Sequence, residues 1–392
     1  MRIGIVAYWF NRGQAVVARQ IRSALDGLGH ETFVLARPTR KTNIRPDWID
    51  RSGVWAQEGV TAASDYQIPL DEYVRWAEGN QLDLVMFDQN YQFPEITQLR
   101  EQGVRTVGRF VWEHFADEHV DIAVEAFDRI YSLTGAEHRR YAEMGIETYR
   151  VRWGCFPELV ELGDRLRAER AEPDWISPYG FPGDNEGDAV FLFPGGFMSK
   201  RKPLVETIEA FRKAEGSQIR LVLKAQVERQ AKRVKRLARG GSRFGIRDHR
   251  IELVTADLPT ADYLAMFAAA DVCLAPSRWE GLGLHLYEAT ALGVPIITND
   301  NAPMNEVVHD GVNGVLVPGI RDGNAPRSGI RAYKPDVPAL TAAIERLADP
   351  GERAQLAEGV WRRREELNWE QTVRDLEALL RFVDARDAEL RG

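Results

Sequence analysis

Short apolar runs alternate with amphipathic helical stretches along most of this chain, a pattern typical of parallel sheets with crossover helices. The first apolar run, residues 3–7, is followed by a helical stretch at 14–28. The later strands that we predict are residues 32–35, 82–87, 105–110, 129–132, 189–194, 220–224, 251–254, 272–275, 295–298 and 314–317. A chain of 392 residues is long enough for two cores. The sequence therefore predicts an α/β protein with two doubly wound, Rossmann-like domains.

A charged stretch that becomes rich in proline and glycine interrupts this pattern at residues 164–188. Such a composition indicates a connection between domains with an exposed loop. The predicted organisation is a domain at 1–165, a linker at 166–188, a second domain at 189–367 and a C-terminal helix at 368–392. This last helix has a broad apolar face, formed by Trp369, Val373, Leu376, Leu380 and Val383.

The composition excludes several classes of protein. Hydrophobic residues make up 44% and charged residues 28%, as in soluble globular proteins, and the net charge of −8 argues against bulk nucleic-acid binding. Cys155 and Cys273 lie far apart in apolar stretches, so we expect buried thiols rather than a disulfide or a metal site. No stretch approaches the roughly 20 apolar residues that span a bilayer. We expect a cytoplasmic protein, at most peripheral to the inner membrane face.

Two glutamates, Glu280 and Glu288, lie in the segment Pro-Ser-Arg-Trp-Glu-Gly-Leu-Gly-Leu-His-Leu-Tyr-Glu-Ala at 276–289. An apolar run precedes this segment and helix-forming residues follow, which predicts a strand, a glycine-rich loop and a helix start. Backbone amides at such a helix start bind anions. If the helix begins near Leu284, Glu288 lies one turn in, where a carboxylate suits sugar hydroxyls better than phosphate. Phosphate at the amides and a ribose diol at the carboxylate predict a nucleotide-sugar site.

The segment 271–319 resembles the retaining glycosyltransferases of family four, which have the GT-B fold. The matching residues are Pro276-Ser277, Glu280-Gly281-Leu282-Gly283, Glu288-Ala289, Gly293-Val294-Pro295-Ile296-Ile297, and the tail of Glu306, Gly311 and Gly314. Leu282 stands where the family more commonly has an aromatic residue. The resemblance covers the C-terminal half of the chain well and the N-terminal half only loosely.

The resemblance implies two Rossmann-like domains facing a cleft, with the C-terminal helix crossing back to the first domain. A helix packed only on the second domain is the alternative. The domain at 1–165 would be the acceptor side, and the domain at 189–367 would bind the nucleotide sugar. The implied reaction moves a sugar from a nucleotide-diphosphate sugar to a hydroxyl with retention, and the leaving phosphate takes the acceptor proton. Catalysis with Glu280 as a nucleophile remains an alternative.

The resemblance also assigns roles within the second domain. Lys202 occupies the family's lysine position beside the donor diphosphate, where fixed cations stabilise the leaving group. The family's companion arginine is Phe197 here, so Lys200 or Arg201 would supply that contact. Glu280 would contact hydroxyls of the transferred sugar. The donor-binding residues that we expect are Glu288, Gly283, Leu284, Lys202, Arg201, Gly196 and Lys224. For Lys224, at a strand end, a snorkelling side chain is an equal alternative to a phosphate contact.

In the first domain, His114 follows a strand where the family often has a histidine that touches the donor sugar. Glu113 or Trp112 could hold this place instead, and a histidine beside aromatics is often only a packed side chain. The acceptor-side candidates are Gly13, Tyr8, Trp9 and Asn90. Aromatic faces stack on sugar rings, but these aromatics could equally belong to the core.

Absent motifs narrow the function further. There is no Walker loop, no complete dinucleotide fingerprint and no Asp-x-Asp at a strand end, so we expect transfer without a metal and no cofactor beyond the co-substrate. The partners would be the nucleotide-sugar donor and a glycan, lipid-linked or small-molecule acceptor, with no nucleic acid. The basic run at 232–247 suits a solvated helix face better than a contact with anionic lipid. A GT-B phosphorylase, a sugar epimerase and a non-catalytic nucleotide-sugar-binding protein remain as alternatives.

Overall fold

The computed structural model describes residues 1–41, 45–170, 188–196, 199–216, 218–226, 248–326 and 328–391, without the side chains of residues 170 and 382–391. The chain forms two compact units, Met1–Trp153 with Glu370–Gly392, and Gly154–Trp369. The division at residue 153 precedes the linker expected at 166–188, so residues 154–165 belong to the second unit. Most of that linker, Phe197 and the basic run at 232–247 lie outside the described residues.

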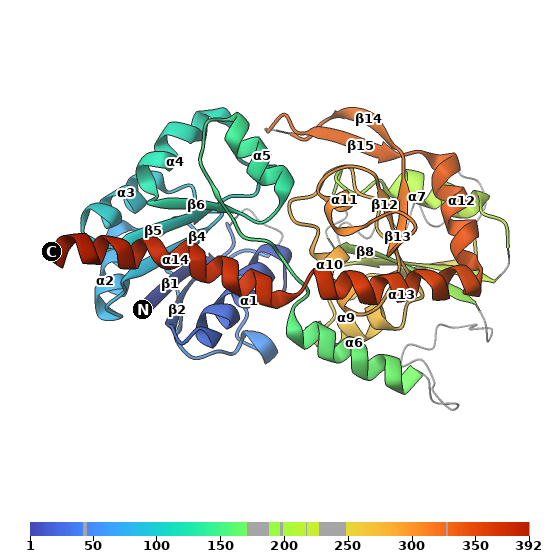
Figure 1. The fold of residues 1–392 in the computed structure, drawn as a ribbon, viewed down its shortest axis with the longest axis horizontal. Helices are drawn as coiled ribbons and strands as arrows, with labels where there is room; N and C mark the ends of the chain where they lie inside the picture. The colour runs from blue at the N-terminus through green and yellow to red at the C-terminus, as the bar shows by residue number, and fades with distance from the viewer. Residues whose placement is uncertain are drawn as a thin grey trace. The chain divides into compact units, whose positions relative to one another are not determined.

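The first unit contains a seven-stranded parallel sheet in the order β3-β2-β1-β4-β5-β6-β7 (Figure 1). The strands are β1 (Arg2–Tyr8), β2 (Glu31–Arg37), β3 (Val60–Ala62), β4 (Leu84–Asp88), β5 (Arg105–Arg109), β6 (Arg129–Ser132) and β7 (Tyr149–Arg150). The five strands expected in this part of the sequence are all present. The sequence analysis missed β3 and β7, because runs of three and two residues are too short to show an apolar pattern.

Helices flank this sheet, with α3, α4 and α5 on one side and α1 on the other (Figure 1). The helices of the first unit are α1 (Gly13–Gly27), α2 (Leu70–Gly79), α3 (Phe93–Glu101), α4 (Val120–Ala126), α5 (Gly135–Glu143) and most of α14 (Trp369–Arg391), with short 3-10 turns η1 (Gly53–Trp55) and η2 (Asp117–His119). Arg152 ties α14 to this unit: its backbone N and side-chain Nε and Nη2 donate to Asp375 at 2.9, 2.8 and 2.7 Å.

The second unit contains a six-stranded parallel sheet in the order β10-β9-β8-β11-β12-β13 and a separate antiparallel pair, β14-β15. The strands are β8 (Ala189–Gly196), β9 (Ile219–Ala225), β10 (Ile251–Val254), β11 (Val272–Leu274), β12 (Ile296–Asn299), β13 (Gly314–Val317), β14 (Gly319–Asn324) and β15 (Arg331–Pro335). All six strands of the parallel sheet lie where the sequence predicted them. The antiparallel pair was not predicted.

The described helices of the second unit are α6 (Pro157–Arg170), α7 (Leu204–Lys213), α9 (Thr260–Ala268), α10 (Leu284–Ala291), α11 (Met304–Val307), α12 (Val337–Ala348) and α13 (Pro350–Glu366). Apolar side chains from α7 and α12 pack against the sheet, including the fully buried Ile208, Phe211, Leu340 and Ile344. The side chains of Asp336 and Asp349 cap α12 and α13 by accepting from the backbone N of Ala339 and Glu352, each at 2.9 Å.

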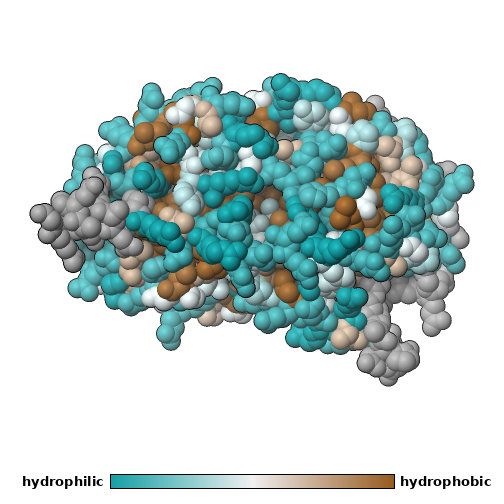
Figure 2. Space-filling view, in the orientation of Figure 1, coloured by the Kyte–Doolittle hydropathy of each residue, from teal (hydrophilic) through white to brown (hydrophobic). Residues whose placement is uncertain are grey.

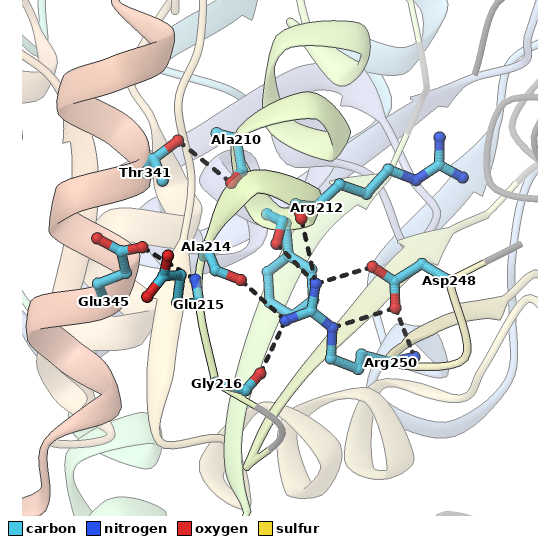
Figure 3. Close-up of polar contacts among 10 residues, drawn as sticks. Ala210, Arg212, Ala214, Glu215, Gly216, Asp248, Arg250, Thr341 and Glu345 are labelled. Carbon is cyan, nitrogen blue, oxygen red and sulfur yellow. Dashed lines mark hydrogen bonds and ion pairs between the residues drawn. The ribbon is translucent and has the colours of Figure 1, made fainter. Parts of the chain in front are cut away.

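Arg250 closes the C-terminal end of α7 (Figure 3). Its guanidinium donates to the backbone oxygens of Phe211, Arg212, Ala214 and Gly216 at 3.3, 3.4, 3.0 and 2.9 Å. Asp248 holds the same guanidinium at 2.9 Å. The last carbonyls of a helix lack intrahelical partners and attract cations. Arg250 therefore fixes the turn between α7 and β9 and, with it, the start of β10.

Both cysteines, Cys155 and Cys273, are buried free thiols, as predicted. Hydrophilic residues predominate on the face shown in Figure 2, and apolar residues form small separate patches there. None of the helices in the described ranges combines the length and the apolar character that crossing a bilayer requires.

Candidate functional site

The order of strands in the second sheet reverses between the neighbours β8 and β11. From this pair the chain runs outward through β9 and β10 on one side and through β12 and β13 on the other. In open parallel sheets, ligands bind beyond the carboxyl ends of the strands at such a switch point. The segments that leave these two ends, 199–203 and 275–283 among the described residues, contain three of the predicted donor-binding residues, Arg201, Lys202 and Gly283, together with Glu280.

The helix predicted to begin near Leu284 begins there, as α10. Gly283 precedes it with φ +77°, in the left-handed region that favours glycine. Because glycine has no side chain, it cannot cap the first-turn amides. The amino end of α10 therefore carries the partial positive charge and the backbone N–H groups that suit an anion.

Glu280 lies at the centre of a buried ionic cluster. Its Oε1 accepts hydrogen bonds from Lys202 Nζ at 2.8 Å and Ser277 Oγ at 2.6 Å, and its Oε2 accepts from Arg201 Nη1 at 2.9 Å. The side chains of Glu280 and Lys202 are only 3% and 4% exposed. The backbone N of Arg278 also donates to the Arg201 carbonyl at 2.9 Å. The cluster thus joins the segment after β8 to the segment after β11.

The protonation of this cluster follows from burial and from its own charges. Burial alone would raise the pKa of Glu280, but Arg201 and Lys202 outweigh it and hold that pKa well below its usual range. Burial lowers the pKa of Lys202, and Glu280 partly counters this effect. Two cations, Arg201 and Lys202, are paired with one ionised carboxylate, so the cluster has a net positive charge. This charge would attract a phosphate group at this edge of the sheet.

Glu288 lies in a different environment. It is partly buried on α10, and its Oε2 accepts a hydrogen bond from the Tyr263 hydroxyl at 3.1 Å. Burial raises the pKa of Glu288 to about 7, although the bond from Tyr263 lowers it. No cation pairs with Glu288 among the residues that the structure describes. Its carboxyl group is therefore bonded to a neutral hydroxyl rather than to a cation.

Two other predicted donor residues lie at the same edge of the sheet. Gly196 ends β8 with φ +53°. Lys224, near the end of β9, is buried, and its Nζ donates to the carbonyls of Ala225 and Ala256 at 2.9 and 2.6 Å. Lys224 therefore ties β9 to the segment after β10, so the snorkelling alternative is wrong for this side chain.

The acceptor-side candidates gather at the switch point of the first sheet, between β1 and β4. Gly13 is exposed at the start of α1, and Tyr8 is partly buried at the end of β1. Trp9 is fully buried and donates from Nε1 to the Trp55 carbonyl at 2.9 Å. Asn90 is also fully buried and donates to the Tyr73 hydroxyl at 2.8 Å. Trp9 and Asn90 are core residues, so their assignment to an acceptor wall is corrected.

His114 lies in the turn that follows β5 in the first unit and is exposed. Its Nε2 is 3.7 Å from Glu113 Oε1. Trp112 and Glu113, the alternatives for its place, are both partly buried. His114 is therefore the most exposed of these three residues, which follow the carboxyl end of β5.

Sequence reasoning missed several groups at the edge of the second sheet. Tyr263 comes from α9 and left no signal near the motif that it contacts. Asn299 donates from Nδ2 to the Ser277 carbonyl at 3.1 Å and supports the loop from β12. His285 has a buried Nε2 without a hydrogen-bond partner, and burial, together with Lys202, lowers its pKa to about 3. The position of His285 beside Gly283 and Leu284 was the only available hint.

Residues 188–349, which include Lys202, Glu280 and Glu288, match the protein family described as Glycosyl transferases group 1. These residues are a glycosyl transferases group 1 domain. Two relatives are D-inositol 3-phosphate glycosyltransferases. The one from Acidothermus cellulolyticus is 28% identical over 263 residues, 64% of this chain and 52% of the relative. The one from Salinispora tropica is 36% identical over 115 residues, 29% of this chain and 21% of the relative.

A third relative, the GDP-mannose-dependent alpha-(1-6)-phosphatidylinositol monomannoside mannosyltransferase of Mycolicibacterium smegmatis, is 33% identical over 147 residues. That match covers 35% of this chain and 34% of the relative. The chain thus spans about half or less of the length of the curated relatives it matches.

Solved structures resemble nearly the whole chain, and not only the residues that match the group 1 family. Sucrose-phosphate synthase from Thermosynechococcus elongatus superimposes with a TM-score of 0.71 at 20% identity, covering 98% of this chain and 100% of that one. Anabaena HepE in complex with UDP and glucose gives a TM-score of 0.66 at 15% identity, covering 98% and 100%. The predicted GT-B fold, with two Rossmann-like domains, is confirmed.

Proposed function

We propose that this protein is a retaining glycosyltransferase of family four that moves a sugar from a nucleotide-diphosphate sugar to a hydroxyl acceptor without a metal. The observation that carries the proposal is the buried pairing of Glu280 with Lys202 and Arg201 at the switch point of the second sheet. Cations and a helix amino end meet there, as a diphosphate leaving group requires.

In this proposal the donor lies along the edge formed by β8, β11 and α10. Lys202, Arg201 and the amides of Gly283 and Leu284 hold the diphosphate, and Gly196 leaves room for its close approach. Glu288 accepts hydrogen bonds from the ribose diol. The separate environments of the two glutamates support these roles, because Glu280 is bonded to cations whereas Glu288 is bonded to a neutral hydroxyl.

The bond between the anomeric carbon and the leaving phosphate oxygen breaks while the acceptor oxygen attacks from the same face. The acceptor proton passes to the departing phosphate oxygen, so no enzyme base is needed. Glu280 supports the positive charge that develops near the anomeric carbon. Its lowered pKa and its three hydrogen bonds make it a poor nucleophile, which favours this front-face route over a covalent intermediate.

The first unit would provide the acceptor side. His114, exposed at the carboxyl end of β5, is assigned to the transferred sugar, and Tyr8 and Gly13 to the acceptor. The acceptor is a glycan, a lipid-linked molecule or a small molecule. The names of the relatives favour acceptors with an inositol phosphate, whether small or lipid-linked.

A thermal-shift screen of nucleoside diphosphates and their sugars identifies the donor, and NMR of the product then reports the anomeric configuration. We expect a donor-dependent stabilisation and a product with the configuration of the donor. An inverted product would disprove retention, and loss of transfer in EDTA would disprove the metal-free route. Turnover that requires inorganic phosphate indicates a phosphorylase, isomerisation of the donor sugar indicates an epimerase, and donor binding without turnover indicates a non-catalytic protein.

A further inference from the structure

Arg37, at the end of β2, is a buried cation whose contacts are all neutral. Its side chain donates from Nε to the Tyr66 carbonyl at 2.7 Å and from Nη1 to the Gln89 carbonyl at 3.3 Å. The guanidinium also lies over the Tyr66 ring, 3.8 Å from its centre. Arg37 is 2% exposed, and within the described ranges no carboxylate pairs with it. Burying a charge without a counter-charge is costly, so this arrangement needs an explanation.

A second cation shares the same aromatic ring. The guanidinium of the exposed Arg40 lies 4.4 Å from the centre of the Tyr66 ring, and its Nη2 donates to the Tyr66 hydroxyl at 2.9 Å. The neighbouring carboxylates bond to other cations: Asp65 lies 3.2 Å from Lys41, and Asp88 accepts from Arg109 at 2.7 Å. Two guanidinium groups that repel each other are therefore held around one ring, and the described part of the chain pairs neither with an acid.

Gln89 adds an unsatisfied donor to this corner. It follows β4 with φ +50°, a conformation that non-glycine residues rarely adopt and that is often kept at functional sites. Its side chain is buried; Oε1 accepts from the Tyr91 hydroxyl at 3.1 Å, but Nε2 has no hydrogen-bond partner. A buried N–H donor without an acceptor indicates a missing polar group.

These groups surround the switch point of the first sheet. Tyr8, Arg37 and Gln89 lie at the carboxyl ends of β1, β2 and β4, which are adjacent strands. The ring of Tyr8 lies 6.4 Å from that of Tyr66. The acceptor assigned to Tyr8 under the proposed function would therefore lie beside both arginines.

We propose that the corner formed by Arg37, Arg40, Tyr66 and Gln89 binds a phosphomonoester group on the acceptor. This inference rests on the proposed function for the identity of the acceptor, but not for the existence of the anion site. A phosphomonoester carries close to two negative charges and three acceptor oxygens near neutral pH. It matches two guanidinium groups and one amide donor in charge and in hydrogen bonds.

The first test measures binding of inorganic phosphate to the full chain by calorimetry. Arg40→Ala removes an exposed side chain, and we expect it to weaken phosphate binding by about tenfold or more, as for loss of one charge-assisted hydrogen bond. Arg37→Lys keeps the buried charge but loses the planar fork, and should weaken binding similarly. Lys41→Ala is the matched control, because Lys41 is adjacent and exposed but paired with Asp65. Equal phosphate affinity in wild type and Arg40→Ala would overturn the anion site.

The second test compares transfer to glucose and glucose 6-phosphate, and to inositol and inositol 3-phosphate, with glucuronate as a carboxylate probe. We expect a KM at least about tenfold lower for a phosphorylated acceptor, and we expect Arg40→Ala to abolish this preference without changing the donor KM. Equal transfer to phosphorylated and plain acceptors, or a preference for glucuronate, would overturn the inference while the proposed function stands. Phosphate binding that depends on Arg40, in a protein that neither binds a donor nor transfers sugar, would instead support the anion site and refute the proposed function.

Discussion

The hydroxyl of Tyr263 donates a hydrogen bond to Oε2 of Glu288 across 3.1 Å, linking α9 to the first turns of α10. This bond is the only polar contact of the Glu288 carboxyl group among the described residues. Burial raises the pKa of Glu288 to about 7, so the group changes charge near neutral pH. The residue that we assign to the donor ribose therefore also changes its protonation in this pH range.

Donor affinity should consequently depend on pH. The ionised carboxylate accepts two hydrogen bonds from a ribose diol better than the protonated acid does, so the affinity should rise with pH around a midpoint near 7. Calorimetry with the donor nucleotide between pH 5.5 and 8.5 measures this effect. Glu288→Gln should bind about tenfold or more weakly at pH 8 and lose the pH dependence. The same pH profile in both proteins would remove Glu288 from the donor site.

The stability of the ligand-free protein should respond in the opposite direction. The pKa of Glu288 is higher in the folded state than its ordinary value of 4.5, so the unfolded state loses the proton first. Stability is therefore lost as the pH rises from about 4.5 to about 7 and then levels off. Glu288→Gln removes this penalty and should raise Tm at pH 8 by a few degrees, but not at pH 4.5. Thermal denaturation of wild type and variant at pH 4.5 and pH 8 measures this difference. A variant less stable than wild type at pH 8 would contradict a raised pKa for Glu288.

Tyr263→Phe isolates the hydrogen bond itself. Because this bond lowers the pKa of Glu288, its loss should move the midpoint of donor binding to higher pH and weaken donor affinity at pH 7 while sparing it at pH 8.5. The same calorimetric series measures the shift. Tyr149→Phe, at an exposed tyrosine of the first unit, is the control and should leave the midpoint unchanged. A lower midpoint in Tyr263→Phe would mean that the hydroxyl does not stabilise the ionised carboxylate.

The sequence predicted features that a single segment determines. Strand β11, the glycine-rich loop after it and the start of α10 at Leu284 all follow from local residue choice, so their positions could be read from one stretch of chain. Lys202 was located by resemblance, because it occupies the family's lysine position in the segment after β8. Its pairing with Glu280, 78 residues away, depends on which strands are neighbours in the sheet, and residue spacing along the chain does not give that.

The sequence did not predict which of the candidate side chains are buried. Trp9 and Asn90 sit in loops that follow strands, as binding residues do, yet both are fully enclosed by partners from distant segments, Trp55 and Tyr73. Tyr263 was missed for the same reason: the sequence of its own helix, α9, does not indicate a contact with Glu288. Local pattern therefore located the loops of the site, whereas tertiary packing decided which side chains line it.

Lys202→Ala should affect both stability and turnover. It leaves Glu280 buried with one cation fewer, and breaking a buried pair costs about 3–5 kcal/mol. We expect a lower urea midpoint and, where the protein still folds, slower transfer. Lys213→Ala is the control, because Lys213 is exposed on α7 and pairs with Glu209 of the same helix. Equal losses in the two variants would mean that the Glu280–Lys202 pair has no special role.

The closeness of α13 to the turn at 310–314 gives a prediction about stability alone. A Cβ on Gly359 would lie 1.8 Å from the Val312 carbonyl oxygen, which is backbone and cannot swing aside. Gly359→Ala should therefore push α13 off this turn and cost about 3 kcal/mol or more, the range of severe overpacking. Gly27→Ala, at the end of α1, meets nothing within 4 Å and should change stability by less than about 1 kcal/mol. Urea unfolding of the two variants makes the comparison, and similar midpoints would show that α13 and the turn are not in this close contact.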